Sequence, residues 1–192
     1  MVKTNNKFST MNKHFFVSML LGTLTTTQSV FAQKMTLTIK KNSHYENVNF
    51  ELIGVGEVTI NWGNDERDID FLGPNSISYE HSYPPYKVPW IITITGAKVR
   101  YLNCNNYSNN SKIKSLDVSK NIKLKNLWCR DNKITSLDMN GNIGLKVLNC
   151  RYNKLTYPTL NVLFESLHDN DVEGEKIVRY LATLGSLIVI KA

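Results

Sequence analysis

A stretch of 21 residues that occurs twice in succession constrains the fold of this chain more than any other feature. The segment SLDVSKNIKLKNLWCRDNKIT (residues 115–135) is followed directly by SLDMNGNIGLKVLNCRYNKLT (residues 136–156), and the two agree at 13 of 21 positions. A unit of this length cannot bury an apolar face alone, so successive units must stack against one another. The repeat therefore predicts stacked coils whose short strands run parallel and form a ladder.

The shared positions predict which side chains point into the stack. Leu127 and Cys129 alternate on a short strand, so they lie on one side of it, and Trp128 between them lies on the other. An asparagine at 132, and again at 153, can bond to backbone groups of its own turn and of the neighbouring coil. The pattern L-x-x-L-x-C-x-x-N-x-I/L is similar to that of leucine-rich repeats.

An earlier copy of the pattern runs from Val99 through Leu102 to Cys104 and is followed by a longer loop. The cysteines of successive copies are 25 and 21 residues apart, which an insertion of four residues explains. Because Cys104, Cys129 and Cys150 hold the same place in each copy, we expect them to be stacked, buried and reduced. A disulfide is a weaker alternative, because it would bend the ladder. A metal site is weaker still, because each coil offers one ligand and no histidine is near these thiols in the sequence.

Residues 34–97 have a different pattern, typical of short antiparallel strands. The segments MTLTIK, VTINW, ISYEHSY and WIITIT are rich in β-branched and aromatic residues, and turn residues in GNDE, LGPN and YPPYKVP separate them. A unit of this size predicts a small β-sandwich that uses a neighbour for further burial.

Three segments in this part of the chain carry a resemblance to a known domain. VTINWGND, YEHSY and WIITITGAKVRYLNC resemble the β-sandwich of the polycystic-kidney-disease type (PKD-like), with its W-G-D-G turn, here altered to Trp62-Gly63-Asn64-Asp65. The order of a signal peptide, this unit and the coils resembles a group of leucine-rich-repeat proteins exported by Gram-negative anaerobic bacteria. The resemblance spans about residues 55–168 and implies a fold rather than a particular function.

The first 32 residues predict a secretory signal peptide. They hold three lysines and no acidic residue, then an apolar run from Phe15 to Leu24, and they end with Val30-Phe31-Ala32. The run is shorter than the roughly 20 residues that a membrane span needs, and no cysteine near residue 33 offers a lipid anchor. We therefore expect cleavage after Ala32 and a secreted, cell-surface or periplasmic protein without a membrane span.

The charge that remains after cleavage does not point to nucleic acid as a partner. Residues 33–192 hold 20 basic and 16 acidic residues, a net charge of +4. The basic residues are scattered rather than gathered in a stripe that could follow a phosphate backbone.

The segment after the coils predicts a helix, because Leu160, Leu163, Phe164 and Leu167 have the spacing of one helical face. The resemblance suggests a last strand after it, either EKIVRYL or SLIVIKA. The apolar run at the end is atypical of a capped solenoid, and a truncated or frame-shifted end is one explanation.

The sequence thus predicts a mainly β chain with one C-terminal helix. Its parts are a signal peptide (1–32), a PKD-like antiparallel β-sandwich (33–97), a leucine-rich-repeat solenoid of about three coils (98–156) and an atypical cap (157–192).

No motif in the sequence predicts catalysis. None of His44, His81 and His168 belongs to a metalloprotease-type pair, and no nucleophile-elbow or phosphate-loop motif occurs. GVGEVT (54–59) lacks the third glycine of a dinucleotide-binding loop, so we expect it to join two strands, and we expect His81 to be packed in its strand. We therefore expect a non-catalytic protein without a cofactor or a metal site.

The outward side chains of the ladder predict a recognition surface. Its residues are Tyr101, Asn103, Asn126, Trp128, Arg130, Asn149, Arg151 and Tyr152. Aromatic, Arg and Asn side chains together are the composition expected where a ligand binds, although ordinary solvent-facing positions are an alternative. We therefore predict a binding or adhesion module with a protein or glycan ligand. The other possibilities are an accessory domain of an extracellular enzyme system, a catalytic domain of unrecognised type in the β-sandwich, and a truncated structural fragment.

Overall fold

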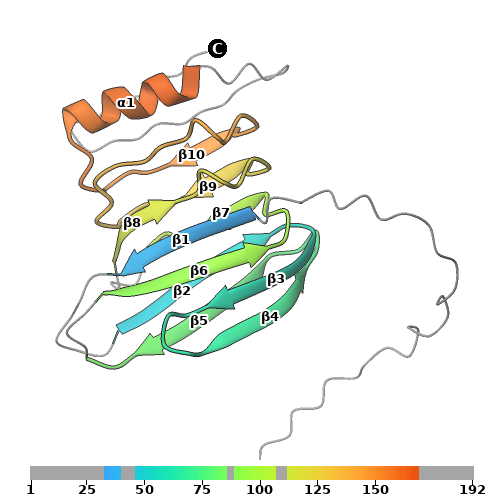
Figure 1. Ribbon diagram of the computed structural model, residues 1–192. Coiled ribbons are helices and arrows are strands. Elements are labelled where there is room, and N and C mark those ends of the chain that lie inside the picture. Colours follow the sequence, from blue (N-terminus) through green and yellow to red (C-terminus); the bar gives the residue numbers. More distant parts are fainter. Residues whose placement is uncertain (1–32, 40–45, 86–88, 107–111, 169–192) are drawn as a thin grey trace, which may run out of the picture. The chain divides into compact units, whose positions relative to one another are not determined.

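The computed structural model describes residues 33–39, 46–85, 89–106 and 112–168 (Figure 1). The predicted signal peptide, His44 and the predicted last strand lie outside these residues. Within them the elements are β1 (Gln33–Ile39), β2 (Glu46–Ile53), β3 (Gly56–Asn61), β4 (Arg67–Leu72), β5 (Ile77–Tyr83), β6 (Trp90–Gly96), β7 (Tyr101–Asn103), β8 (Ile113–Asp117), β9 (Asn126–Trp128), β10 (Val147–Asn149) and α1 (Tyr157–His168). The prediction of a mainly β chain with one helix is confirmed for the described residues.

The strands form two sheets of five strands each. Sheet A has the order β4-β3-β6-β1-β8 with antiparallel neighbours throughout, and sheet B has the order β10-β9-β7-β2-β5. Burial alternates along β1, where Met35, Leu37 and Ile39 are buried, because successive side chains of a strand point to opposite faces. The inward side chains of both sheets form one apolar core.

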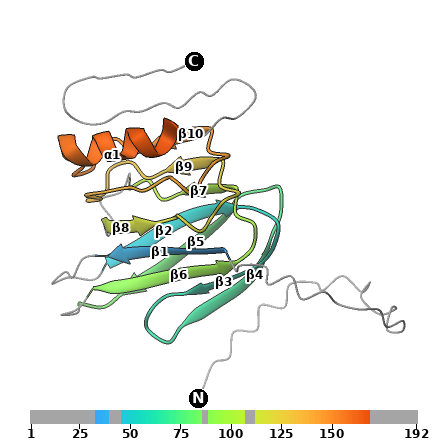
Figure 2. The same ribbon diagram turned by 45° about the horizontal axis from the view of Figure 1, so that its top comes forward.

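Each sheet continues from the N-terminal strands into the coils (Figures 1 and 2). In sheet B, β2 pairs with β7, and Leu52 is the register partner of Leu102. In sheet A, β1 pairs with β8, and Leu37 is the partner of Leu116. Strand pairs on both sides of the core therefore join the two parts of the chain that the sequence analysis divides between residues 97 and 98. The coils cover one edge of each sheet, whose N–H and C=O groups would otherwise be unpaired.

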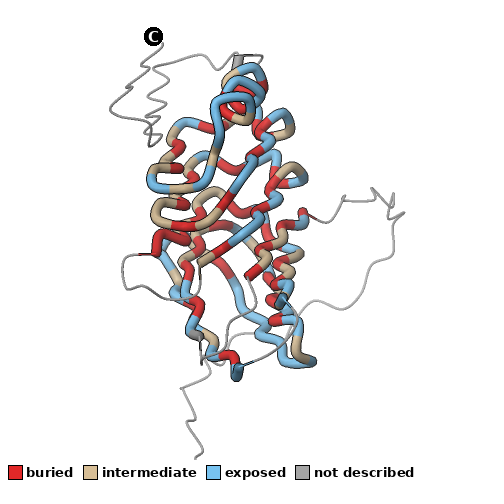
Figure 3. The backbone as a smooth tube through the Cα atoms, turned by 90° about the vertical axis from the view of Figure 1, so that its left-hand side faces the viewer, coloured by how far each residue is buried: buried red, intermediate tan, exposed pale blue. Residues whose placement is uncertain are grey.

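Beyond these strands the chain repeats one set of backbone contacts. β7, β9 and β10 run parallel, with Leu102, Leu127 and Leu148 in register. On the other side of the coils, Lys133 and Lys154 each donate their backbone N–H to a carbonyl oxygen of the preceding coil at 2.8 Å. Figure 3 shows how buried positions alternate with exposed ones along these turns.

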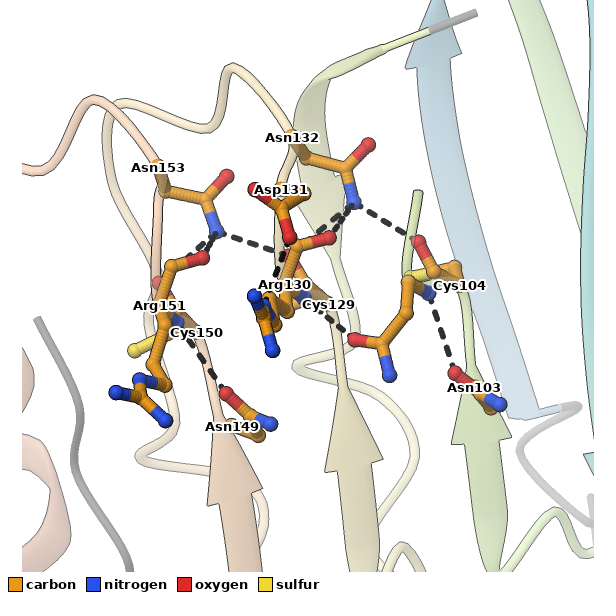
Figure 4. Close-up of polar contacts among 11 residues, drawn as sticks. Asn103, Cys104, Cys129, Arg130, Asp131, Asn132, Asn149, Cys150, Arg151 and Asn153 are labelled. Carbon is orange, nitrogen blue, oxygen red and sulfur yellow. Dashed lines mark hydrogen bonds and ion pairs between the residues drawn. The ribbon is translucent and has the colours of Figure 1, made fainter. Parts of the chain in front are cut away.

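Asparagine side chains hold each turn to the one before it, as predicted (Figure 4). The Asn132 amide donates to the carbonyl oxygens of Cys104, Cys129 and Arg130, and its oxygen accepts from the N–H of Ile113. Asn153 makes the corresponding contacts one coil later. Backbone groups that the tight turns leave unpaired thus find partners inside the protein.

The opposite turn of the coil is also held by an amide and is closely packed. The Asn142 side chain donates to the carbonyl oxygens of Val118 and Asn121 at 3.0 and 2.9 Å. A Cβ atom on the neighbouring Gly141 would clash with the carbonyl oxygen of Ser119. Glycine is therefore required where these two turns approach each other.

Helix α1 follows the last coil and packs on it. Leu160, Leu163 and Leu167, predicted to share one helical face, are buried. The buried Ser166 hydroxyl oxygen accepts from the N–H of Met139 at 3.4 Å, which links the helix to the coil. Within the part of the chain that the structure describes, no helix is long and apolar enough to cross a membrane.

The sequence patterns did not predict β2 or β4. In β2, Val48, Phe50 and Leu52 alternate inward as in an ordinary half-buried strand. In β4, Leu72 is buried, whereas Ile69 and Phe71 point the other way and are 63% and 70% exposed. Because β4 is the edge strand of sheet A, its side chains lack a second neighbouring strand to cover them.

Candidate functional site

The outer face of sheet B carries a regular array of side chains, because alternate residues of its strands point away from the core. Glu51 of β2 is the register partner of Asn103 of β7, which pairs in turn with Trp128 of β9, and Trp128 pairs with Asn149 of β10. These side chains form one row across four strands. The next row consists of Ile53, Tyr101, Asn126 and Val147.

The eight predicted binding residues lie on this face and on the loops that follow its strands. Tyr152 is 43% exposed, and the other seven are partly exposed. Trp128, which the alternation places on the outward side of its strand, is among these partly exposed residues. Asn103 and Asn149 are its register partners on the two neighbouring strands, and such strands lie about 4.8 Å apart.

Two arginines and a tyrosine stand at the loop end of the face. Nε of Arg130 is 2.7 Å from Oδ2 of Asp131, and the backbone N–H of Arg130 donates to Oδ1 of Asn105 at 2.7 Å. The guanidinium carbons of Arg130 and Arg151 lie 4.7 and 5.5 Å from the ring centroid of Tyr152. Both distances fall within the cation–π range of about 6 Å. Figure 4 shows the two arginines on neighbouring coils.

The face also extends beyond the predicted ladder, onto β2 and β5. A depression of about 180 Å³ lies there, lined by Asn49, Phe50, Glu51, Ser78, Asn103 and Asn105. Two donors hold the carboxylate in it: the hydroxyl of Ser76 at 3.3 Å and the amide of Asn103 at 3.4 Å, both to Oε2 of Glu51. The sequence prediction missed this half of the face, because the pairing of β2 with β7 joins segments about 50 residues apart. The alternation of Asn and Glu with apolar residues in ENVNFELI is the signal that could have found it.

The three cysteines lie inside the coils as free, buried thiols. Burial raises the pKa of Cys104 and Cys150 to about 12, and it raises the pKa of Cys129 well above the usual value. A thiol that stays protonated at neutral pH is a poor nucleophile and a poor metal ligand. In the described ranges no group of three His, Cys, Asp or Glu side chains could hold a metal ion. We interpret the thiols as packing groups.

His81 belongs to an aromatic cluster rather than to a reactive site. Its ring stacks on Trp62 with centroids 4.6 Å apart and meets the edge of Tyr83 at the same distance. The Asn64 amide nitrogen lies 3.1 Å from Nε2 of His81, and Nε1 of Trp62 donates to Oδ2 of Asp68 at 3.0 Å. The turn at Trp62-Gly63-Asn64 is thereby fixed against β5, which is a structural role. Gly54 and Val55 join β2 to β3, as predicted for GVGEVT.

No protein-family model, no curated protein and no solved structure matches this chain. The geometry of the outer face of sheet B is therefore the basis for assigning a function.

Proposed function

We propose that this protein is an exported, non-catalytic binding or adhesion module whose ligand docks on the outer face of sheet B. The observation that carries the proposal is the contrast between the two sides of β9 and β10. The inward position repeats as Leu127 and Leu148, while the outward position beside it changes from Trp128 to Asn149. A constant scaffold with a variable outer face is the arrangement that solenoid proteins use for recognition.

The proposal includes the type of each part of the chain. The parallel register of β7, β9 and β10 and the contacts of Asn132 and Asn153 support coils of the leucine-rich-repeat type. The Trp62 turn stacked on His81 supports a PKD-like unit before them. Residues 1–32 would then direct export, so that the mature chain begins at Gln33 in the periplasm, on the cell surface or outside the cell. N-terminal sequencing of the exported protein tests this, and a chain that keeps residues 1–32 contradicts it.

The ligand class under this proposal is a protein or a glycan. The outer rows of sheet B combine amides, a carboxylate, aromatic rings and arginines, which suits directional hydrogen bonding with stacking. Nucleic acid is not invoked, because the mild net charge of residues 33–192 gives no reason for it.

A glycan and protein array tests the proposal, with the exported protein as the probe. Each positive is measured again with Trp128→Ala and with Phe71→Ala, which removes an exposed aromatic from the outer face of sheet A as a matched control. Binding that Trp128→Ala weakens and Phe71→Ala leaves intact supports the proposal. If both variants still bind, the ligand binds at another surface. If the only positives on the array are extracellular enzymes, the accessory role is supported instead.

A further inference from the structure

The backbone at Tyr152 adopts a conformation that tyrosine disfavours. Its φ is 55°, and Asp131, 21 residues earlier at the same place in the preceding coil, has a φ of 60°. Asp, Asn and Gly adopt this left-handed region readily, whereas bulky residues adopt it at some cost. The ring is 43% exposed, so burial does not compensate for that cost. A strained residue with an exposed side chain is a reason to look for a function of that side chain.

The surroundings of the ring carry positive charge. The guanidinium groups of Arg130 and Arg151 both lie within cation–π distance of it. Arg130 is paired with Asp131, whereas Arg151 makes no ion pair among the described residues. The two arginines and one carboxylate leave a net positive charge beside an exposed aromatic ring. Guanidinium groups recognise carboxylates and sulfates through paired hydrogen bonds.

The rest of the face is suited to hydroxyl groups. Asn103 and Asn149 lie in the row next to the loops that carry Arg130 and Arg151. The depression lined by Asn49, Glu51 and Ser78 extends this row onto β2 and β5. An amide both donates and accepts, as a sugar hydroxyl does. The core of a protein–protein interface, by contrast, is mainly apolar, whereas most outward positions of β2 and β5 are Asn, Glu or Ser, with Ile53 as the apolar exception.

We infer that the outer face of sheet B binds an acidic polysaccharide. Tyr152, Arg130 and Arg151 hold a carboxylate or sulfate group of the chain, and the amide rows with Glu51 hold neighbouring hydroxyls. This inference rests on the proposed function and narrows its ligand class.

The first test compares pairs of polysaccharides that share a backbone and differ in whether it carries free acidic groups. Binding of the purified protein is measured by biolayer interferometry to polygalacturonate and its fully methylated ester, and to dextran sulfate and dextran. We expect binding to at least one charged member, weaker binding to its neutral counterpart, and a loss of affinity as salt screens the charges. The carboxylated and sulfated pairs show which anion is preferred.

The second test makes one substitution at the same place in two neighbouring coils. Tyr152→Asn removes the ring and relieves the strained backbone, so we expect about tenfold weaker binding with an equal or higher melting temperature. Asp131→Asn keeps a residue that suits its φ and removes the carboxylate beside Arg130, so we expect tighter binding of the same polysaccharide. Arg151→Gln should weaken binding and reduce its salt dependence.

Each alternative outcome overturns a stated part of the inference. Equal binding to the charged and the neutral member of a pair would show that the ligand need not be acidic. The proposed binding function would still hold. Poly-glutamate is measured in the same way, and tighter binding to it than to all four polysaccharides, lost in Tyr152→Asn, shows that the ligand is an acidic peptide rather than a polysaccharide. Wild-type binding by Tyr152→Asn, or no binding of the wild type to any of the four polysaccharides, refutes the inference.

Discussion

The coils and the N-terminal strands build their cores in different ways. In the coils the same side chain returns every 21 residues, so that Leu127 and Leu148 stand in register and are fully buried. In the N-terminal strands the core depends on rings from distant segments, and Phe50 lies 5.6 Å from both Trp62 and Tyr79 between ring centroids. A repeated core therefore divides its stability among equivalent coils, whereas the aromatic cluster joins several strands at once.

The first way to test this contrast is to remove the centre of the aromatic cluster. Trp62→Ala deletes a side chain that is 1% exposed and leaves Asp68 without its indole donor. We expect a loss of about 3–5 kcal/mol in the free energy of unfolding, measured by urea denaturation. Phe71→Ala, at a ring that is 70% exposed, is the control and should change stability by no more than about 0.5 kcal/mol. Similar losses in the two variants would contradict the role of the cluster.

The second prediction concerns two neighbours in one coil. Leu127→Ala removes a large inward side chain and should cost about 2–5 kcal/mol. Cys129→Ala removes a smaller, equally buried group, so its loss should be clearly smaller. Thermal melts of the two variants measure which substitution costs more stability. An equal or larger loss for Cys129→Ala would mean that the thiols do more than fill space.

The third prediction compares the two turn asparagines. Asn132→Ala leaves three carbonyl oxygens and the N–H of Ile113 without this partner inside the core, so we expect a loss of about 1–3 kcal/mol. Asn153 is partly exposed, and water can replace its amide, so Asn153→Ala should cost less. Chemical denaturation of the two variants measures the difference. Equal losses would show that burial does not govern the contribution of these amides.

The fourth prediction concerns the stability of the protein at alkaline pH. At neutral pH the buried thiols should not affect how stability depends on pH. A thiol ionises near pH 9 in the unfolded chain, whereas burial raises the pKa of Cys104 to about 12 in the folded protein. Between these values the folded state holds more protons, so stability falls as the pH rises. Each thiol should contribute at most about 1.4 kcal/mol per pH unit. Denaturation of Cys104→Ala from pH 8 to about pH 11 should give a flatter profile than the wild type, and an unchanged profile would contradict this.

The sequence predicted the coils better than the strands before them. A period of 21 residues exposes the roles of Leu127, Cys129 and Asn132 by direct comparison with the next copy. Strand β4 gave no such signal, because Ile69 and Phe71 point outward. The pairing of β2 with β7, and hence the part of the site around Glu51, depends on contacts between distant segments. The alternation within a single strand does not specify its partners.

The candidate site was predicted in composition but not in geometry. The outward positions of β9 and β10 follow from alternation, yet alternation does not reveal that Trp128 is only partly exposed. The left-handed backbone at Tyr152 was also not apparent, since tyrosine is not a residue expected there.

The central claim is that the repeated inward positions hold the coils and the variable outward positions bind the ligand. Leu127 and Trp128 are adjacent on β9 and point to opposite sides of it. The most direct test measures melting temperature and ligand binding on the same samples of Leu127→Ala and Trp128→Ala. We predict that Leu127→Ala melts at a much lower temperature, and that Trp128→Ala melts near the wild type while its binding weakens by about 2 kcal/mol. A melting temperature for Trp128→Ala as low as that of Leu127→Ala, or undiminished binding by Trp128→Ala, would contradict the claim.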